Sequence, residues 1–520
     1  MNRLKFNRDI LYISVILLCG FLLSIYLGSF KTGYYIDEYL TYAYSNCKDF
    51  GSAFTDHNFV TEKAFIDTFS VAPQHRFDYK MVWNNQAADV HPPLYHVLIH
   101  TICSFMPGTF SKWQGLSVNI VFFLLILFVT YKMVYILCKN KELDFLICVF
   151  MALNPTLLHS VTFIRMYMMC SFFIVFLTYL IVCHIHLNSD NVLFYIKLIL
   201  TIIFGSLTHY YFIIFAFFIC SIYGIYLIYK RYFKDLIKCI LSALLAAAIS
   251  LMVFPHMIDH IFKGYRGEQT FSNLSNSNLI ECINNYIKII VNDFWGLEAT
   301  KIILLFVMLF FLSAMLIAIF KHNLKEYMLY FKNGLLLIIL SGICYFTLVA
   351  KISPSTTERY IYPIYPLILL CIFVVTGQSI TYIFKKRPSL IIFGTLLISL
   401  TTFGYRTHTM PNLYLNSKDR INIAMQYKDN TCLYIYKATY RICDSYVDIR
   451  RYNRILFMCT DNDEEIILDN RLKTEKSLIV YVDLGLDTEN LRNQILEQGS
   501  YLNKYTLLYS YGYVNVYYFE

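Results

Sequence analysis

The stretch Ile10–Phe30 reads ILYISVILLCGFLLSIYLGSF, and the polar segment KTGYYIDEYL, residues 31–40, follows it directly. An apolar run of this length can cross a membrane as one α-helix, because about twenty residues span the hydrocarbon core. It is longer than the apolar part of a signal sequence and carries no A-x-A cleavage site, so we expect an uncleaved first span. The polar residues from Lys31 to His100 should therefore emerge at a membrane surface.

The composition of the whole chain supports a membrane protein. The 520 residues are 57% hydrophobic, 18% aromatic and only 15% charged, and their mean hydropathy is +0.51. A soluble domain cannot bury so much apolar surface. The net charge of +9 would suggest nucleic acid in a soluble protein, but here the basic residues lie in short tracts between apolar segments. They indicate membrane topology, and we expect no nucleic-acid partner.

The apolar segments predict a polytopic α-helical membrane protein with about eleven spanning helices, within a range of roughly ten to thirteen. Several of them are short and need neighbouring helices in a bundle to be stable in the membrane. The segments lie near residues 10–30, 115–138, 142–160, 166–187, 192–208, 210–229, 238–256, 301–320, 333–350, 361–380 and 389–405.

Basic tracts set the predicted orientation. They precede the first span and follow the second, sixth, eighth and tenth, with members such as Arg3, Lys141, Lys230, Lys321 and Lys385. With eleven spans all of these tracts face the cytoplasm, as positive residues usually do. We therefore expect a multi-pass protein of the plasma (inner) membrane with a cytoplasmic N-terminus. The loops 31–113, 257–300 and 351–360 and the C-terminal tail then face outward.

One apolar segment, Leu94–Met106, is too short to be counted as a span. It has about thirteen residues, which favours a helix that lies on or dips into the membrane surface. Counting it as a span would also turn every later basic tract outward. We therefore keep it within a large first outer loop, residues 31–113, which we expect to contain interfacial helices.

The last part of the chain has a different pattern, and we divide the chain into a transmembrane domain, 1–410, and a small extracytoplasmic α/β domain, 411–520. Short apolar runs at 433–436, 455–458, 478–482 and 511–519 predict strands. The segment 488–498 predicts a helix.

Two adjacent carboxylates, Asp37 and Glu38, follow the first span. A carboxylate at a membrane surface can act as a general base toward an acceptor hydroxyl, or ligate a metal together with its neighbour. The alternative is a solvated loop acid, or a charge that favours the first turn of a helix.

The motif DVHPPL, residues 89–94, is more specific. Proline suits the first turn of a helix, so Pro92 and Pro93 predict a helix that begins at Leu94. His91 then lies just before a helix N-terminus, where free N–H groups favour an anion such as phosphate. The alternative is an ordinary proline helix start with a solvated histidine.

Further polar residues lie at predicted outer turns of the bundle. Each alone could be a headgroup contact or part of an interfacial aromatic belt. By the predicted topology, however, they share one face with Asp37 and His91, and a cavity that opens to the outer leaflet would explain them together. They are Arg165 and Tyr167 in RMY, His209 and Tyr210 in THYY, and Arg359 and Tyr360 in TERY.

In this order, the motifs resemble those of the GT-C glycosyltransferases. The closest resemblance is to the protein O-mannosyltransferase and aminoarabinose transferase group (family 39) and its bacterial relatives, over about residues 1–405. It implies a GT-C fold, a polyprenyl-phosphate sugar donor and an active site on the outer face. It assigns the loop base to Asp37, a second acid to Glu38 and the H-P-P segment to His91.

The resemblance leads to the expectation of a hexosyl- or pentosyltransferase that works with inversion. Its acceptor would be a glycan, a glycolipid or a protein. The tail lacks the marks of the lumenal β-trefoil inserts of eukaryotic members, which favours a bacterial enzyme of the cell envelope over one with a protein acceptor. The residues expected to bind the donor or its phosphate are Asp89, His91, Arg165, Tyr167, His209, Tyr210, Arg359 and Tyr360.

Other classes of function remain open at this point. A divalent cation could be held by Asp37, Glu38 and His91, although no cofactor is certain. A flippase or transporter of lipid-linked glycans would also be polytopic, but it should show paired broken helices and internal repeats, which the sequence lacks. A polymerase of lipid-linked glycans would not need the Asp-Glu and H-P-P motifs together. A non-enzymatic scaffold would tolerate substitution of all these polar residues.

Overall fold

The computed structural model describes residues 8–48, 54, 59–187, 191–295, 334–384, 386–460 and 466–520. Contacts within the chain divide it into two compact units. Unit 1 comprises Met1–Leu27, Gln86–Tyr95 and Leu116–Met410. Unit 2 comprises Gly28–Asn85, His96–Gly115 and Pro411–Glu520.

Eight helices of the described residues are long and apolar enough to cross a membrane. Each coincides with a span predicted from the sequence, so the chain is a multi-pass membrane protein. They are α1 (Arg8–Phe30), α6 (Lys112–Cys138), α9 (Tyr167–Leu187), α11 (Tyr210–Tyr229), α12 (Phe233–Val253), α18 (Leu335–Ile352), α19 (Tyr365–Ile383) and α20 (Lys386–Thr407).

The remaining predicted spans have different outcomes. The segment 142–160 forms two helices, α7 (Lys141–Leu153) and α8 (Pro155–Val161), bent by 54° at a break, and they make a ninth span if counted together. The break occurs at Asn154, whose side chain caps α8 while Pro155 occupies its first turn. Helix α10 (Val192–Ser206) is apolar but shorter than a full span. The predicted span 301–320 lies outside the described residues.

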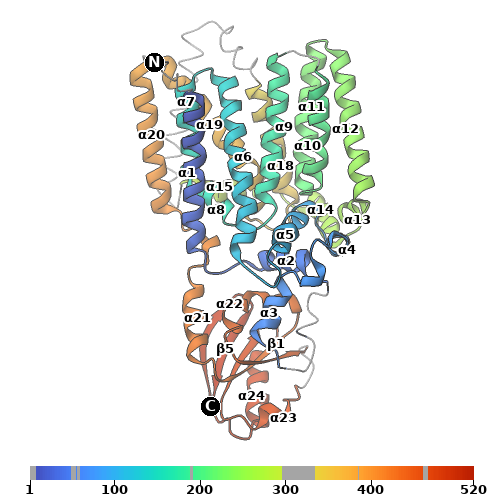
Figure 1. The fold of residues 1–520 in the computed structure, drawn as a ribbon, viewed down its shortest axis with the longest axis vertical. Helices are drawn as coiled ribbons and strands as arrows, with labels where there is room; N and C mark the ends of the chain where they lie inside the picture. The colour runs from blue at the N-terminus through green and yellow to red at the C-terminus, as the bar shows by residue number, and fades with distance from the viewer. Residues whose placement is uncertain are drawn as a thin grey trace. The chain divides into compact units, whose positions relative to one another are not determined.

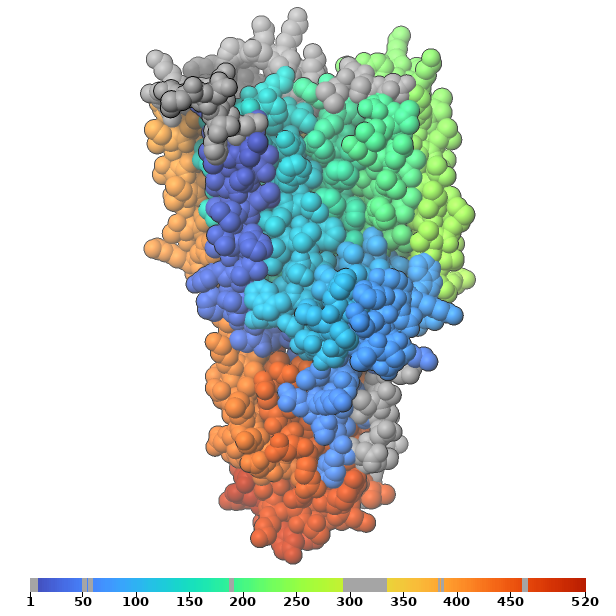
Figure 2. All heavy atoms as spheres, viewed as in Figure 1, coloured from blue at the N-terminus to red at the C-terminus, as the bar shows by residue number. Residues whose placement is uncertain are grey.

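Helix α9 is the most enclosed spanning helix of unit 1, with 78% of its apolar window buried, against 22% for α1 and 17% for α12. Helices α9, α10, α11 and α12 stand side by side (Figure 1), and α11 also packs against α18. Figure 2 shows the atoms of α1 and α12 on the outside of this bundle. Their exposed apolar side chains suit lipid contact, whereas the predicted motif RMY lies at the start of the enclosed helix α9, whose first residue is Tyr167.

Unit 2 contains the α/β fold predicted for the tail. Its five strands are β1 (Thr431–Tyr436), β2 (Arg454–Cys459), β3 (Leu478–Asp483), β4 (Tyr505–Tyr511) and β5 (Val514–Phe519), in the order β2-β1-β3-β5-β4. β1 pairs in parallel with β2 and β3, whereas β5 is antiparallel to β3 and β4. The predicted run 511–519 is therefore the end of β4 and the second strand of a hairpin. Helix α24 (Thr488–Gln498) follows β3, as predicted.

Alternating side chains give this sheet two buried faces. Leu433, Ile435 and Val480 belong to an aliphatic core that includes residues of α24. The opposite face carries aromatic side chains, and Tyr434 stacks on Tyr481 with ring centroids 5.3 Å apart.

Segments of the first outer loop pack against the aromatic face within unit 2. These segments include α2 (Ile36–Asn46) and α3 (Glu62–Phe69), and most of α5 (Leu94–Ser104) also belongs to unit 2. The Tyr446 ring contacts Tyr39 at 5.0 Å and Phe69 at 4.9 Å. Unit 2 thus joins the outer loop and the tail through a shared aromatic core. Helix α5 has 11 residues, which confirms that Leu94–Met106 is too short to span the membrane.

Candidate active site

In unit 1, His91 connects a carboxylate to a guanidinium. Its Nδ1 lies 2.7 Å from Asp89 Oδ2, and its Nε2 lies 3.1 Å from the Nη2 of Arg165. A guanidinium can only donate, so Nε2 must accept, and the ring proton is on Nδ1 and points to Asp89. Both ring nitrogens are thereby engaged, and His91 holds Arg165 in one orientation.

A buried amide fixes the backbone turn that precedes Arg165. The Nδ2 of Asn119, in α6, donates to the carbonyls of Val161 at 3.0 Å and Phe163 at 2.6 Å. Its Oδ1 accepts from the hydroxyl of Tyr95 at 3.0 Å. Asn119 is fully buried, and all three of these hydrogen bonds lie within unit 1. The turn before α9 is therefore anchored on two sides, and Arg165 leaves a rigid part of the bundle.

His209 lies in the turn between α10 and α11. Its Nδ1 accepts from the N–H of Tyr211 at 3.0 Å, which leaves the ring proton on Nε2. Burial lowers the pKa of His209 well below its usual range, and the neighbouring guanidinium groups of Arg165 and Arg359 act in the same direction. His209 is therefore a neutral imidazole among cations, with its Nε2–H as a hydrogen-bond donor.

Aromatic rings surround these groups. The ring of Tyr167 lies 5.3 Å from that of His209 and 6.4 Å from that of Tyr360. The guanidinium of Arg359 lies over the Tyr360 ring at 5.1 Å, in the short helix η3 (Glu358–Tyr360). Such contacts orient a guanidinium without neutralising its charge.

Tyr210 connects to a histidine that the sequence did not single out. Its hydroxyl lies 2.7 Å from Nδ1 of His260, whose Nε2 lies 3.3 Å from the carbonyl of Ala87. The carbonyl can only accept, so Nε2 carries the proton and Nδ1 accepts from Tyr210. His260 belongs to α13 (Met257–Phe262), in the predicted outer loop 257–300.

The predicted phosphate-binding residues thus belong to one unit and come from four separate chain segments. Each of these segments borders a helix start or end on the face predicted to point outward. We call Asp89, His91, Arg165, Tyr167, His209, Tyr210, Arg359 and Tyr360 the cationic cluster.

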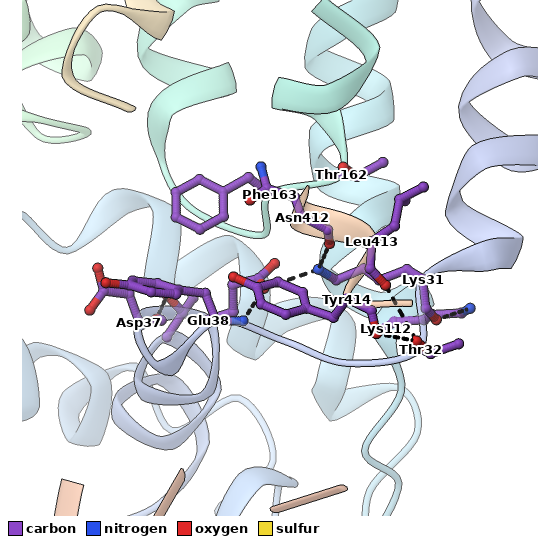
Figure 3. Close-up of polar contacts among 12 residues, drawn as sticks. Lys31, Thr32, Asp37, Glu38, Lys112, Thr162, Phe163, Asn412, Leu413 and Tyr414 are labelled. Carbon is purple, nitrogen blue, oxygen red and sulfur yellow. Dashed lines mark hydrogen bonds and ion pairs between the residues drawn. The ribbon is translucent and has the colours of Figure 1, made fainter. Parts of the chain in front are cut away.

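Glu38 and Asp37 belong to unit 2 and differ in their surroundings. Glu38 is buried, and its Oε2 lies 3.0 Å from Nζ of Lys31 and 2.6 Å from the N–H of Tyr35. Lys31 Nζ also donates to the carbonyl of Asn412 at 2.6 Å. In Figure 3, Glu38 points toward Lys31, whereas Asp37 points away from it. Glu38 thus holds the start of α2, and Asp37 is the more accessible acid of the first turn.

A further carboxylate from the tail lies near Asp37. It is Asp444, in η6 (Thr439–Ser445), the short helix against which α2 packs. Burial raises the pKa of Asp444 to about 6; the Arg420 guanidinium opposes this shift, and the charges of Asp448 and Asp37 add to it. Asp37 therefore faces a carboxyl group that is partly protonated near neutral pH.

The predicted metal ligands do not assemble. No group of three or more His, Cys, Asp or Glu side chains suited to a metal ion occurs in the part of the chain that the structure describes. Asp37, Glu38 and His91 therefore do not form such a site there. Glu38 is matched by Lys31, and both nitrogens of His91 are engaged. Metal dependence itself stays a prediction.

Several supporting residues were missed by the sequence analysis. Asn119 had a usable signal, because a buried amide inside an apolar span usually has a specific task. Lys31 had none, since its partner carbonyl on Asn412 is 381 positions away. Asp444 and His260 likewise acquire their neighbours only in the folded chain.

The described residues thus combine many apolar helices with a smaller unit that carries a mixed sheet, which is the architecture of a polytopic α-helical membrane protein. The structure is similar to that of ArnT from Cupriavidus metallidurans bound to undecaprenyl phosphate, with a TM-score of 0.53, 9% sequence identity, and coverage of 98% of this chain and 97% of that chain. It also matches the archaeal oligosaccharyltransferase AglB from Archaeoglobus fulgidus, in complex with an inhibitory peptide and a dolichol-phosphate, at a TM-score of 0.47 and 10% identity, over 98% of this chain and 75% of that chain.

Comparisons of the sequence alone give no match, either to a protein-family model or to a curated protein. The likeness to ArnT extends over nearly the whole of both chains and shows the fold. It confirms the GT-C fold that the motifs predicted.

Proposed function

We propose that this protein is a GT-C glycosyltransferase that moves a sugar from a polyprenyl-phosphate donor to an acceptor at the outer membrane face, with inversion. The observation that carries the proposal is the cationic cluster, in which Arg165, Arg359 and His209 surround one region of unit 1. In a chain of this fold, the undecaprenyl phosphate bound to ArnT is the kind of ligand whose phosphate such a cluster would hold.

The cluster suits a phosphate leaving group. As the bond between the anomeric carbon and the phosphate oxygen breaks, the electron pair goes to that oxygen and negative charge develops. Arg165, Arg359 and the Nε2–H of His209 would stabilise this charge, and fixed donors do so most effectively. His91 is a positioning residue in this scheme, because it accepts from Arg165 and donates to Asp89.

Asp37 is proposed as the general base. It would take the proton from the acceptor hydroxyl while the acceptor oxygen bonds to the anomeric carbon, and a single displacement of this kind inverts the configuration. Glu38 would position Asp37 by holding the first turn of α2 against Lys31.

The test is transfer of a radiolabelled sugar from polyprenyl phosphate in membranes that contain the full chain. We expect Asp37→Asn to fold and to lose about 10²–10⁴ in rate, the usual contribution of a general base. Asp419→Asn is the matched control, because Asp419 is an exposed acid in the first turn of another helix of unit 2, α21 (Ser417–Gln426). Full transfer by folded Asp37→Asn would contradict the base assignment, and absence of labelled product with the unaltered protein would favour a flippase.

A further inference from the structure

A second group of cations lines a cavity of about 160 Å³ within unit 2. Its charged lining residues are Lys31, Lys112, Arg450 and Arg451, and no acidic side chain of the described residues lines it. Figure 3 shows Lys31 and Lys112 near one another, on either side of the same stretch of backbone. None of these four cations belongs to the cationic cluster, and we call this space the basic cavity.

The charges around the basic cavity do not balance. Lys31 is matched by Glu38 at 3.0 Å, with both side chains fully buried. Among the described residues, the acid within ion-pair distance of Arg450 is Glu62, at 3.6 Å, and its half-exposed side chain is screened by solvent. The Nζ of Lys112 donates to the uncharged backbone carbonyls of Ser29 and Lys31, and burial together with the charge of Lys31 lowers its pKa.

The two arginines also have unused donors. The Nε atoms of Arg450 and Arg451 are buried, and neither has a hydrogen-bond partner among the described residues. Burial and the adjacent charge of Arg450 lower the pKa of Arg451, which is the mark of a cation held near another without a full counter-charge. A buried N–H without an acceptor is unfavourable, so an entering anion would satisfy both the charge and the hydrogen bonds.

The rest of the wall is aromatic. Tyr34 and Phe110 stack with ring centroids 5.2 Å apart, and Tyr446 meets Phe110 edge-on at 5.2 Å. These rings and a few apolar side chains line the same cavity as the cations. Flat apolar faces beside fixed positive charge suit a ligand with both a C–H-rich ring and an anionic group.

We infer that the basic cavity binds an oxyanion carried on a sugar, a phosphate or a carboxylate of the acceptor glycan, through Arg450, Arg451 and Lys112. This inference rests on the proposed function for the identity of the acceptor, since unit 2 also carries the proposed base, Asp37. The binding itself needs no donor and no turnover.

The experiment uses the full-length protein in detergent, with glucose 1-phosphate, glucuronic acid and neutral glucose as probes in a titration by calorimetry. We expect one or both of the anionic sugars to bind and neutral glucose not to bind. The cationic cluster is itself proposed to hold a sugar phosphate, so binding of glucose 1-phosphate is assigned to the basic cavity only where it weakens in Arg451→Gln. Such binding without binding of glucuronic acid identifies phosphate as the oxyanion, and binding of glucuronic acid alone identifies carboxylate. Equal binding of neutral glucose, or no binding of either anionic sugar, would overturn the inference.

Variants locate the binding. Arg451→Gln should weaken the anionic probe about tenfold or more, the usual loss for a charge-assisted hydrogen bond, and Arg451→Lys should restore part of it. Arg454→Gln is the control, because Arg454 is an exposed arginine of β2 that pairs with Glu475. If Arg451→Gln fails to fold, Arg450→Gln replaces it. Unchanged affinity in these variants would refute the site.

The sugar-transfer assay, run in parallel, separates this inference from the proposed function. Anion binding that depends on Arg451 can occur in a protein without transfer, and transfer can occur in a protein without this binding. The transfer assay therefore tests the proposed function alone, and the binding assay tests the basic cavity alone.

Discussion

The cationic cluster of unit 1 and the basic cavity of unit 2 both combine guanidinium groups with tyrosines, but their charges are arranged differently. In the cluster, Asp89, His91 and Arg165 form a chain of hydrogen bonds that fixes one guanidinium. In the cavity, Arg450 and Arg451 are adjacent in sequence, and the part of the wall that the structure describes contains no acidic side chain. The first arrangement suits a charge that develops during a reaction, and the second suits a charge that a ligand always carries.

The same contrast separates the adjacent acids Asp37 and Glu38. Glu38 is enclosed and neutralised by Lys31, so its carboxylate maintains structure. Asp37 is partly exposed in the first turn of α2 and lies near Asp444. Two carboxylates that look equivalent in the sequence thus have different surroundings, with Glu38 beside the buried cation of Lys31 and Asp37 near Asp444.

The largest effect expected to sharpen the contrast between cluster and cavity comes from Arg165→Gln. If Arg165 stabilises the leaving phosphate, transfer should fall by about 10²–10³, as when one fixed donor to a developing charge is removed. Sugar transfer in membranes measures this, with Arg406→Gln, an exposed arginine at the end of α20, as control. Binding of anionic sugars to the basic cavity should not change. A loss of that binding in Arg165→Gln would remove the distinction between the two sites.

A smaller effect, on stability, is expected from Lys31→Met. Removing one partner of a buried ion pair leaves Glu38 uncompensated and should lower the free energy of unfolding by about 3–5 kcal/mol. Thermal unfolding of the purified chain measures it. Lys504→Met breaks the exposed pair with Glu520 and should cost about 0–1 kcal/mol. An equal loss of unfolding free energy in the two variants would show that the Lys31–Glu38 pair stabilises the fold no more than an exposed ion pair does.

The smallest effect is the pH dependence contributed by Asp444. Its pKa in the folded chain is about 6, above the ordinary value of 3.8. The folded state therefore binds this proton more strongly than the unfolded chain, so the stabilisation is complete below about pH 4 and is lost as the pH rises through about 6. The melting temperature of the unaltered protein relative to Asp444→Asn should fall over this interval. A difference that stays constant with pH would contradict the assignment.

Most of the fold was predictable because hydrophobicity is a local property. Every described helix long enough to span the membrane coincides with a predicted apolar run, and short apolar runs predicted the strands around Leu433, Ile455 and Leu478. The break at Asn154 was not predicted, because the apolar run continues through it. The hairpin around Gly512, whose φ is +54°, was likewise read as one strand.

For the candidate site, the sequence predicted which residues take part but not the contacts among them. Topology placed His91, Arg165, His209 and Arg359 on one face, because charged and polar groups collect at helix ends next to a membrane. The tautomers of His91 and His209 follow from hydrogen bonds that only the folded chain forms. The hydrogen bonds by which the Asn119 amide supports the turn before α9 likewise form only in the folded chain.

By itself, then, the sequence determined that this chain crosses the membrane many times, that an α/β segment follows, and which polar residues lie at the ends of helices. The tertiary structure decided that the first outer loop and the tail form one unit, that Glu38 is matched by Lys31 and that Arg450 and Arg451 share a cavity that no described acid lines. The physical reason is the sequence separation of the interacting residues. Burial in lipid or in a sheet follows from the pattern of neighbouring residues, whereas the partner of a charge can come from anywhere along the chain.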